Sequence, residues 1–141
     1  MTEKLNVLFL CTGNSCRSQM AEGWCRFLKN KTINAFSAGT ISQGLNPHAL
    51  DVMRESGVDI SNQKSKTVDE LPSMDFDLVI TLCEDASKNC PYFPGKKVIH
   101  FGFDDPPKLT KNMENKEEVL KVYKRVRDEI KNFITDLEKY L

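Results

Sequence analysis

Hydrophobic positions along the chain alternate between short continuous runs and longer stretches with helical spacing. The apolar run at residues 5–10 (LNVLFL) ends at the turn residues TGNS, which predicts a buried strand. The next stretch, from Ser18 to Lys29, has the spacing of an amphipathic helix. The side chains expected on its buried face are Met20, Trp24, Phe27 and Leu28. The chain therefore opens with a strand, a tight loop and a helix.

Three further apolar runs predict strands, at residues 33–39 (INAFSAG), 77–82 (DLVITL) and 97–101 (KVIHF). Strands separated by helices pair in parallel through right-handed crossovers. We therefore predict an α/β fold with one domain over residues 1–141. Its three α/β/α layers are expected to surround a four-stranded parallel sheet.

Capping residues mark the predicted helix boundaries. Asn46 at the N-cap and Pro47 in the first turn begin one helix, and Gly57 ends it. Residues 67–70 (TVDE) form a capping box that opens a short helix. From about Glu114 apolar residues recur every three or four positions, which predicts a long terminal helix whose many charges form a solvated face.

Composition and charge restrict the function. Twenty basic residues balance twenty acidic ones, so the net charge gives no attraction to nucleic acid or to an anionic membrane. The apolar run near the N-terminus is too short for a signal sequence or a membrane span, so we expect a cytoplasmic protein, and a monomer. Five cysteines without CxxC spacing fit neither a metal site nor, in a reducing compartment, a disulfide framework. No metal or cofactor is expected.

The stretch CTGNSCR at residues 11–17 places a thiol and a guanidinium around a tight loop. Ligands of a parallel sheet gather where strands end, and we expect the first strand to end just before Cys11. Backbone N–H groups of residues 12–15 and the N-terminus of the next helix favour an anion there. Arg17 can bind two oxygens of a tetrahedral oxyanion, and the same surroundings predict a lowered pKa for Cys11. A buried, unreactive Cys11 is the simpler alternative, but the accompanying arginine favours a nucleophile.

These residues carry a resemblance to a known family. CTGNSCRS is similar to the CX5R(S/T) signature of the low-molecular-weight tyrosine phosphatase fold, and CTGNSCRSQMAEGW resembles the thioredoxin-coupled arsenate reductases built on that fold. The likeness continues in SAG, GLNPHAL, GVDISNQ, DLVITLC, GFDDP and RVRDEI. A plain phosphatase of this fold has no need for thiols at Cys83 and Cys90, so their presence favours the reductases.

The resemblance implies that Cys11 attacks arsenate in the loop and that Asp105 donates a proton to the displaced oxygen. It further implies that Cys83 attacks the Cys11 sulfur and expels arsenite. Cys90 then forms a disulfide with Cys83, which thioredoxin reduces. The implied substrate-binding residues are Thr12, Gly13, Asn14, Ser15, Cys16, Arg17 and Ser18. Ser18 is also expected to cap the helix and to donate to the Cys11 thiolate.

The spacing of Cys83 and Cys90 leads to a structural prediction. In one continuous helix their Cα atoms would lie roughly 10 Å apart, beyond the ~7 Å limit for a disulfide. We therefore predict that oxidation melts a short helix here and exposes the disulfide to its reductant.

Some arsenate reductases of this kind hold potassium behind the loop, on residues that match Asn14, Glu22 and Ser37 and on an acidic residue. This chain has Lys66 where that acidic residue would stand. We expect the Lys66 ammonium to take the place of the cation, so that activity does not depend on potassium.

Two other functions remain open. One is phosphomonoester hydrolysis, in which Cys11 forms a phosphocysteine and Asp105 protonates the leaving group, with Asp104 as the alternative acid. The stretch PPKLTK after Asp105 lacks the tyrosines that such phosphatases usually carry there, which favours arsenate reduction. The other is a non-catalytic protein that binds oxyanions or senses redox state.

Overall fold

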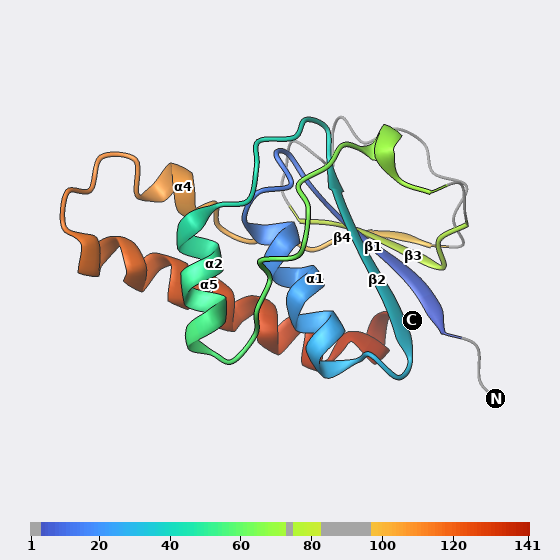
Figure 1. The fold of residues 1–141 in the computed structure, drawn as a ribbon. Coiled ribbons are helices and arrows are strands. Elements are labelled where there is room, and N and C mark those ends of the chain that lie inside the picture. The colour runs from blue at the N-terminus through green and yellow to red at the C-terminus, as the bar shows by residue number, and fades with distance from the viewer. Residues whose placement is uncertain (1–3, 73–74, 83–96) are drawn as a thin grey trace.

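The strand order confirms the predicted parallel sheet. The computed structural model describes residues 4–72, 75–82 and 97–141, and within them four parallel strands lie in the order β2-β1-β3-β4 (Figure 1). The strands are β1 (Leu5–Cys11), β2 (Ile33–Gly39), β3 (Leu78–Thr81) and β4 (Val98–His100). Each strand lies within or close to its predicted apolar run. β3 is buried throughout, as is usual for an inner parallel strand, whereas Val98 and His100 of the edge strand β4 are exposed.

β1 is one of the two inner strands, and it carries the loop of interest at its end. It pairs with β2 from Leu5 beside Ile33 to Cys11 beside Gly39, and with β3 on its other side. β1 therefore extends one residue beyond its predicted end, and Cys11 is the last residue of the strand. The chain leaves β1 for β2 on one side and returns to β3 on the other. The loop after β1 thus lies at a topological switch point, where open α/β sheets bind ligands.

Three helices lie on one side of the sheet (Figure 1): α1 (Arg17–Leu28) packs on β1 and β2, and α2 (Pro47–Glu55) and α5 (Lys116–Thr135) pack against α1. α5 packs against both α1 and α2, and the single turn α4 (Pro106–Leu109) lies against α5. Short 3-10 turns complete the described helices, at Val68–Glu70 and Leu137–Tyr140.

Alternate residues of β1 bury their side chains on opposite faces of the sheet. Val7 and Phe9 belong to the larger core beneath the helices, whereas Leu8 and Leu10 pack with Phe76 on the other face. Both faces are therefore buried, as is usual for parallel sheets.

Capping residues fix the helix ends as predicted. The Asn46 side chain accepts the backbone N–H of His48 at 2.8 Å, and Gly57 has a φ of +86°, which permits the turn after α2. At the 3-10 turn, the Glu70 carboxylate accepts the backbone N–H of Thr67 at 2.7 Å. Local side-chain chemistry was therefore sufficient to locate these boundaries.

Two predictions about helix faces were wrong. Phe27 and Leu28 are 56% and 37% exposed, because they lie at the end of α1, where Phe27 contacts the edge of the Trp24 ring instead of entering the core. Arg127 belongs to the predicted solvated face of the terminal helix but is buried. Its guanidinium donates to the carbonyl oxygen of Val52 at 2.9 Å and thereby joins α5 to α2.

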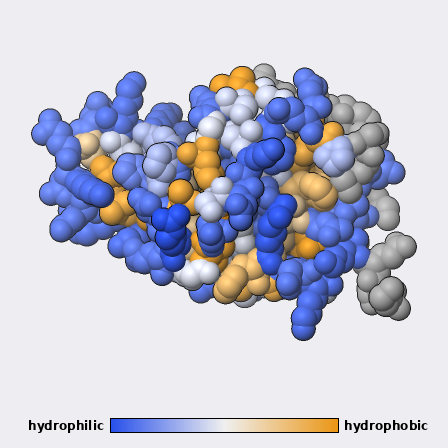
Figure 2. Space-filling model, in the orientation of Figure 1, coloured by the Kyte–Doolittle hydropathy of each residue, from blue (hydrophilic) through white to orange (hydrophobic). Residues whose placement is uncertain are grey.

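Figure 2 shows hydrophilic residues over most of the visible face, with hydrophobic residues in smaller areas between them. Large exposed apolar side chains are distributed over several elements, among them Ile41, Val98, Leu109 and Met113. In the part of the chain that the structure describes, no helix has the length and apolar character that a membrane span requires.

Candidate active site

The loop between β1 and α1 is held by backbone hydrogen bonds to the segment that follows β2. Three of its carbonyl groups accept N–H groups from residues 41–46, each at 3.0 Å: those of Thr12, Gly13 and Ser15. In a trans peptide the N–H group points opposite to the carbonyl group. The amides that follow these carbonyls therefore point away from residues 41–46, and such oriented N–H groups are what a backbone anion site requires.

Two backbone features make the loop tight. Asn14 has a φ of +49°, which residues other than glycine rarely adopt. A Cβ atom on Gly39 would lie 2.6 Å from the carbonyl oxygen of Thr12 and 2.8 Å from the backbone nitrogen of Asn14. Only glycine therefore lets the end of β2 approach the loop this closely.

The Asn14 side chain is fully buried and stabilises this conformation. Its Nδ2 donates to Ser18 Oγ at 2.9 Å, while its Oδ1 accepts Gln19 Nε2 at 2.9 Å and the backbone N–H of Lys66 at 2.8 Å. Two segments of the chain, α1 and the segment at Lys66, thus hold one amide, which offsets the strain of the positive φ.

Ser18 lies within the first turn of α1, and Cys16 occupies the N-cap position. The predicted cap at Ser18 was therefore wrong, because the N-cap lies two residues earlier, at Cys16. The Ser18 hydroxyl accepts a hydrogen bond from Asn14 and keeps its own proton. Its donation to Cys11 stays a prediction.

Gln19 is a supporting residue that sequence reasoning missed. Its Nε2 also donates to the carbonyl oxygen of Lys64 at 3.0 Å, and its Oε1 accepts Gln63 Nε2 at 2.8 Å. These contacts join α1 to a segment more than forty positions away. Nothing in the local pattern around a buried glutamine signals such partners.

Arg17 is the first residue of α1 and is buried close to the acidic segment before α4. Its Nη1 donates to the carbonyl oxygen of Phe103 at 3.1 Å, and its Nη2 lies 3.5 Å from Asp105 Oδ2. Among the described residues, the buried Arg17 Nε has no hydrogen-bond partner. An unpaired buried donor is unfavourable, and an oxyanion at the loop would satisfy it.

The structure separates the two adjacent aspartates. The Asp105 side chain is 37% exposed and faces Arg17. Asp104 is 60% exposed and pairs with Arg125 Nη2 of α5 at 3.0 Å. Of the two carboxyl groups, the one that faces the loop arginine is therefore Asp105, the residue predicted to donate the proton.

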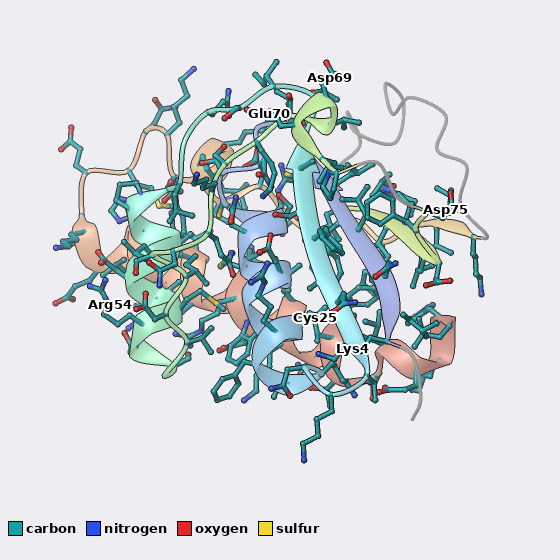
Figure 3. All side chains as sticks on the ribbon, turned by 45° about the vertical axis from the view of Figure 1, so that its right-hand side comes forward. Lys4, Cys25, Arg54, Asp69, Glu70 and Asp75 are labelled. Carbon is teal, nitrogen blue, oxygen red and sulfur yellow. The ribbon has the colours of Figure 1, made fainter. Side chains whose placement is uncertain are left out.

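The other described cysteines, Cys16 and Cys25, are buried in the hydrophobic core. Burial raises the pKa of Cys16 above its ordinary value, although Arg17 opposes this, and burial raises the pKa of Cys25 to about 12. Cys25, labelled in Figure 3, lies on α1 about 12 Å along the helix from Arg17. Both side chains therefore stay thiols near neutral pH. Cys83 and Cys90, with the short helix predicted between them, lie outside the described residues.

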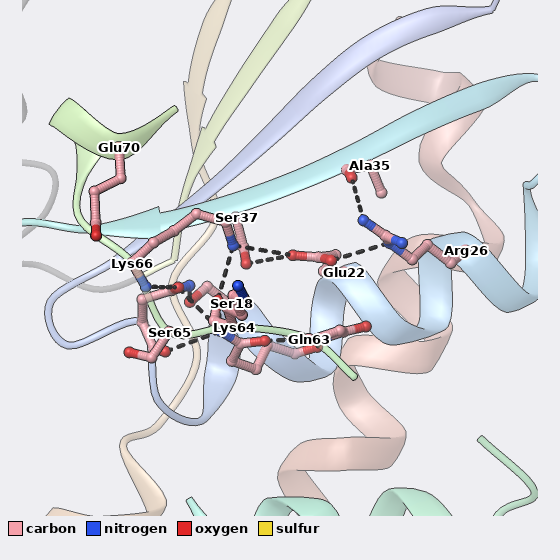
Figure 4. Close-up of polar contacts among 12 residues, drawn as sticks. Ser18, Glu22, Arg26, Ala35, Ser37, Gln63, Lys64, Ser65, Lys66 and Glu70 are labelled. Carbon is pink, nitrogen blue, oxygen red and sulfur yellow. Dashed lines mark hydrogen bonds and ion pairs between the residues drawn. The ribbon is translucent and has the colours of Figure 1, made fainter. Parts of the chain in front are cut away.

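A buried carboxylate stands behind the loop (Figure 4). Glu22 Oε1 accepts the Ser37 hydroxyl at 2.5 Å and lies 4.0 Å from Lys66 Nζ, while Glu22 Oε2 lies 2.9 Å from Arg26 Nε. Burial lowers the pKa of Lys66, and the neighbouring Glu22 carboxylate opposes that shift. Charge on this carboxylate is thus balanced by side chains of the protein.

These residues do not fit a potassium ion. Lys66 Nζ also donates to the carbonyl oxygen of Lys64 at 2.8 Å, so the ammonium is anchored beside Glu22. A metal cation on the same carboxylate oxygen would be repelled by the ammonium. The independence of potassium stays a prediction.

A cysteine at the tip of a central parallel strand, a backbone anion loop and an arginine at the head of the next helix are features of α/β proteins that bind phosphate-like anions. Residues 6–141 match the family model described as low molecular weight phosphotyrosine protein phosphatase, and the chain belongs to this family.

The similar proteins with known names include arsenate reductases. An arsenate reductase of Bacillus licheniformis is 50% identical over 128 residues, which are 90% of each chain. A solved structure of an arsenate reductase in the oxidized state has a TM-score of 0.78 at 31% identity, covering 94% of this chain and 95% of that one. A thioredoxin-dependent arsenate reductase of Corynebacterium glutamicum has a TM-score of 0.71 at 27% identity, covering 99% of this chain and 62% of that one. The predicted resemblance to arsenate reductases of this fold is confirmed.

Proposed function

We propose that the protein reduces arsenate to arsenite through Cys11, Cys83 and Cys90, and that thioredoxin reduces the resulting disulfide. The observation that carries this proposal is the position of Arg17, which begins α1 beside the loop and faces Asp105 at 3.5 Å. This geometry favours an oxyanion held against a thiolate with an acid within reach. The names of the similar reductases support arsenate as that oxyanion.

In the first step, the Cys11 thiolate attacks the bound arsenic and a sulfur–arsenic bond forms. One arsenate oxygen leaves as water and takes a proton from Asp105. Arg17 and the loop amides stabilise the negative charge on the remaining oxygens.

In the second step, the Cys83 thiolate attacks the Cys11 sulfur. The sulfur–arsenic bond breaks and its electron pair stays on arsenic, so arsenic(V) becomes arsenic(III) and leaves as arsenite. Cys90 then attacks the Cys83 sulfur of the new disulfide and releases the Cys11 thiolate. A thioredoxin dithiol reduces the Cys83–Cys90 disulfide by exchange and becomes oxidised itself.

The described residue that precedes Cys83 supports the involvement of that thiol. The backbone N–H of Leu82 donates to Leu10 at 2.8 Å, and its carbonyl oxygen accepts the N–H of Phe103 at 3.1 Å. The chain therefore enters Cys83 from a residue bonded both to the strand that ends at Cys11 and to the acidic segment.

Consumption of NADPH with arsenate, thioredoxin and thioredoxin reductase tests the proposal. Cys83→Ser and Cys90→Ser should each abolish this turnover but retain hydrolysis of a phenyl phosphate ester by Cys11. Cys25→Ala is the matched control, because that thiol is buried far from the loop, and it should keep both activities. Sustained arsenate turnover in either serine variant would contradict the relay.

Phosphomonoester hydrolysis is the second candidate, because the matched family is described as a phosphatase family. The same loop accommodates a phosphate ester, and Asp105 would protonate its leaving group. Peptide mapping after arsenate treatment separates the candidates. A protein that hydrolyses esters but forms no Cys83–Cys90 disulfide would be a phosphatase.

A further inference from the structure

The carbonyl groups of residues 12–15 are each held by a hydrogen bond, but not all by the same kind of donor. Three of them accept backbone N–H groups of residues 41–46. The carbonyl of Asn14 accepts instead the side-chain Nε2 of Gln19, a fully buried residue of α1, at 3.0 Å. Among the described residues, no backbone N–H donates to this carbonyl. A single side chain therefore holds it in place.

The direction of the Asn14 carbonyl decides the direction of the next amide. The peptide bond between Asn14 and Ser15 is trans, so the Ser15 N–H points opposite to that carbonyl and away from Gln19. Among the described residues, the Ser15 N–H has no hydrogen-bond partner, and it can donate to an oxyanion in the loop. Rotation of this one peptide plane would exchange the two groups and turn a carbonyl oxygen toward the anion.

The orientation of the Gln19 side-chain amide follows from its neighbours. Its Nε2 faces the backbone carbonyl oxygens of Asn14 and Lys64, each at 3.0 Å. Because a carbonyl oxygen can only accept, the group that faces them must be the NH2. The Gln19 Oε1 then faces Gln63, whose Nε2 donates to it at 2.8 Å and to the Gln19 backbone carbonyl at 3.0 Å. Gln63 therefore keeps the Gln19 amide from turning over.

These contacts are compatible with two roles for Gln19. Its NH2 has two hydrogens for three oxygens at 2.9 to 3.0 Å, those of the Asn14 carbonyl, Asn14 Oδ1 and the Lys64 carbonyl. In one role Gln19 fixes the peptide after Asn14, and in the other it only ties α1 to the segment at Lys64. The φ of +49° at Asn14 favours the first role, because such a conformation persists only where its surroundings hold it.

We propose that Gln19 is a positioning residue, whose side-chain amide, oriented by Gln63, holds the peptide between Asn14 and Ser15 so that the Ser15 N–H faces the bound oxyanion. The inference deepens the proposed function and rests on it, because it requires an oxyanion in the loop. Gln19 acts in this role through the backbone of the loop and not by contact with the reacting atoms.

Inorganic phosphate is the probe, because its affinity can be measured without turnover. Gln19→Met keeps the length of the side chain and removes both hydrogen-bonding groups of the amide. Trp24→Phe is the matched control, since it also removes a buried N–H of α1, which donates to the Arg127 carbonyl at 3.1 Å. Calorimetry measures the Kd of phosphate, NMR measures the shift of the Ser15 amide proton on binding, and urea denaturation measures the stability of each variant.

Gln19→Met should raise the Kd of phosphate about 10-fold, as expected for the loss of one hydrogen bond to a charged group. In the natural protein, phosphate should shift the Ser15 amide proton downfield, and Gln19→Met should lose most of this shift. Trp24→Phe should lower the stability but leave the Kd within about 2-fold and the shift unchanged. Gln63→Met should raise the Kd about 3-fold, and it should have no further effect in the Gln19→Met background.

A Kd within about 2-fold in Gln19→Met, an equal rise in Trp24→Phe, or an unchanged shift of the Ser15 amide would each overturn the inference. If Gln19→Met does not fold, the half-buried Gln63 decides, and an unchanged Kd in Gln63→Met overturns the inference. A natural protein that binds phosphate but reduces no arsenate would reject the proposed function alone. A natural protein that binds no phosphate would overturn both.

Discussion

The two sides of the anion loop differ in how completely their polar groups are satisfied. On the supporting side, defined by Asn14, Glu22, Ser37 and Lys66, side chains meet partners at 2.5 to 2.9 Å, and only the contact between Lys66 and Glu22 is longer. On the reactive side, defined by Cys11, Arg17 and Asp105, the ion pair spans 3.5 Å. There, Arg17 Nε lacks a partner among the described residues.

This difference separates support from binding. A polar group whose hydrogen bonds are all made within the protein has no donor or acceptor left for a ligand, but it holds its neighbours in one conformation. A buried guanidinium with an unused donor keeps capacity for an anion. Changes on the reactive side should therefore alter turnover, and changes on the supporting side should alter stability first.

The largest expected effect tests the two aspartates of the reactive side. Asp105→Asn should lower kcat by about 10²- to 10⁴-fold, the usual contribution of a general acid, because an amide has no proton of suitable acidity. Asp104→Asn is the matched control and should stay within about 2-fold, since that carboxylate pairs with Arg125 at the surface. Steady-state kinetics measure both variants. Equal losses would show that the 3.5 Å approach of Asp105 to Arg17 does not mark the acid.

A smaller loss of activity is expected when the planar guanidinium of Arg17 is replaced by the single ammonium group of lysine. Arg17→Lys keeps the charge but loses two-oxygen binding of the oxyanion and the contact with Phe103. We expect kcat/KM to fall about 100-fold, comparable to the loss of one preorganised donor. Arg125→Lys, on the exposed pair with Asp104, should be almost neutral. Full activity of Arg17→Lys would mean that the unpaired Nε has no role in binding.

A substitution on the supporting side should lower the stability of the fold. Glu22→Gln retains the shape of the side chain but removes the negative charge that faces both Arg26 and Lys66. Because Lys66 is only partly buried, we expect the free energy of unfolding to fall by about 1–2 kcal/mol. Urea denaturation at neutral pH measures it. The matched control is Glu118→Gln, in an exposed pair with Lys121, which should lower the free energy of unfolding by less than about 0.5 kcal/mol. An equal loss of stability in both variants would contradict a special role of the supporting side.

The same contrast explains what the sequence could predict. The strands, the caps at Asn46 and Thr67, and the grouping of Cys11 with Arg17 depend on residues close together in the chain, and local patterns reveal them. The approach of Asp105 to Arg17 was expected from a family resemblance, since spacing along the chain does not give it.

The contacts that were missed join distant segments. Gln19 to Lys64, Arg127 to Val52 and Asn46 to Tyr123 each depend on how finished elements pack. The exposure of Phe27 has the same origin. Periodicity shows which face of a helix is apolar, but it does not show how far along the helix other elements pack on that face.

The smallest expected effect concerns the cation behind the loop. At matched ionic strength, replacing sodium by potassium should change kcat/KM by less than about 2-fold, because Lys66 Nζ already stands 4.0 Å from Glu22. Lys66→Asp sharpens the test, since it sets a second carboxylate beside Glu22 and leaves the negative charge unbalanced. That variant should be less active in sodium and recover in potassium by several-fold. A similar stimulation of the natural protein would mean that the ammonium does not serve as the counter-charge, and that the supporting side takes up an ion after all.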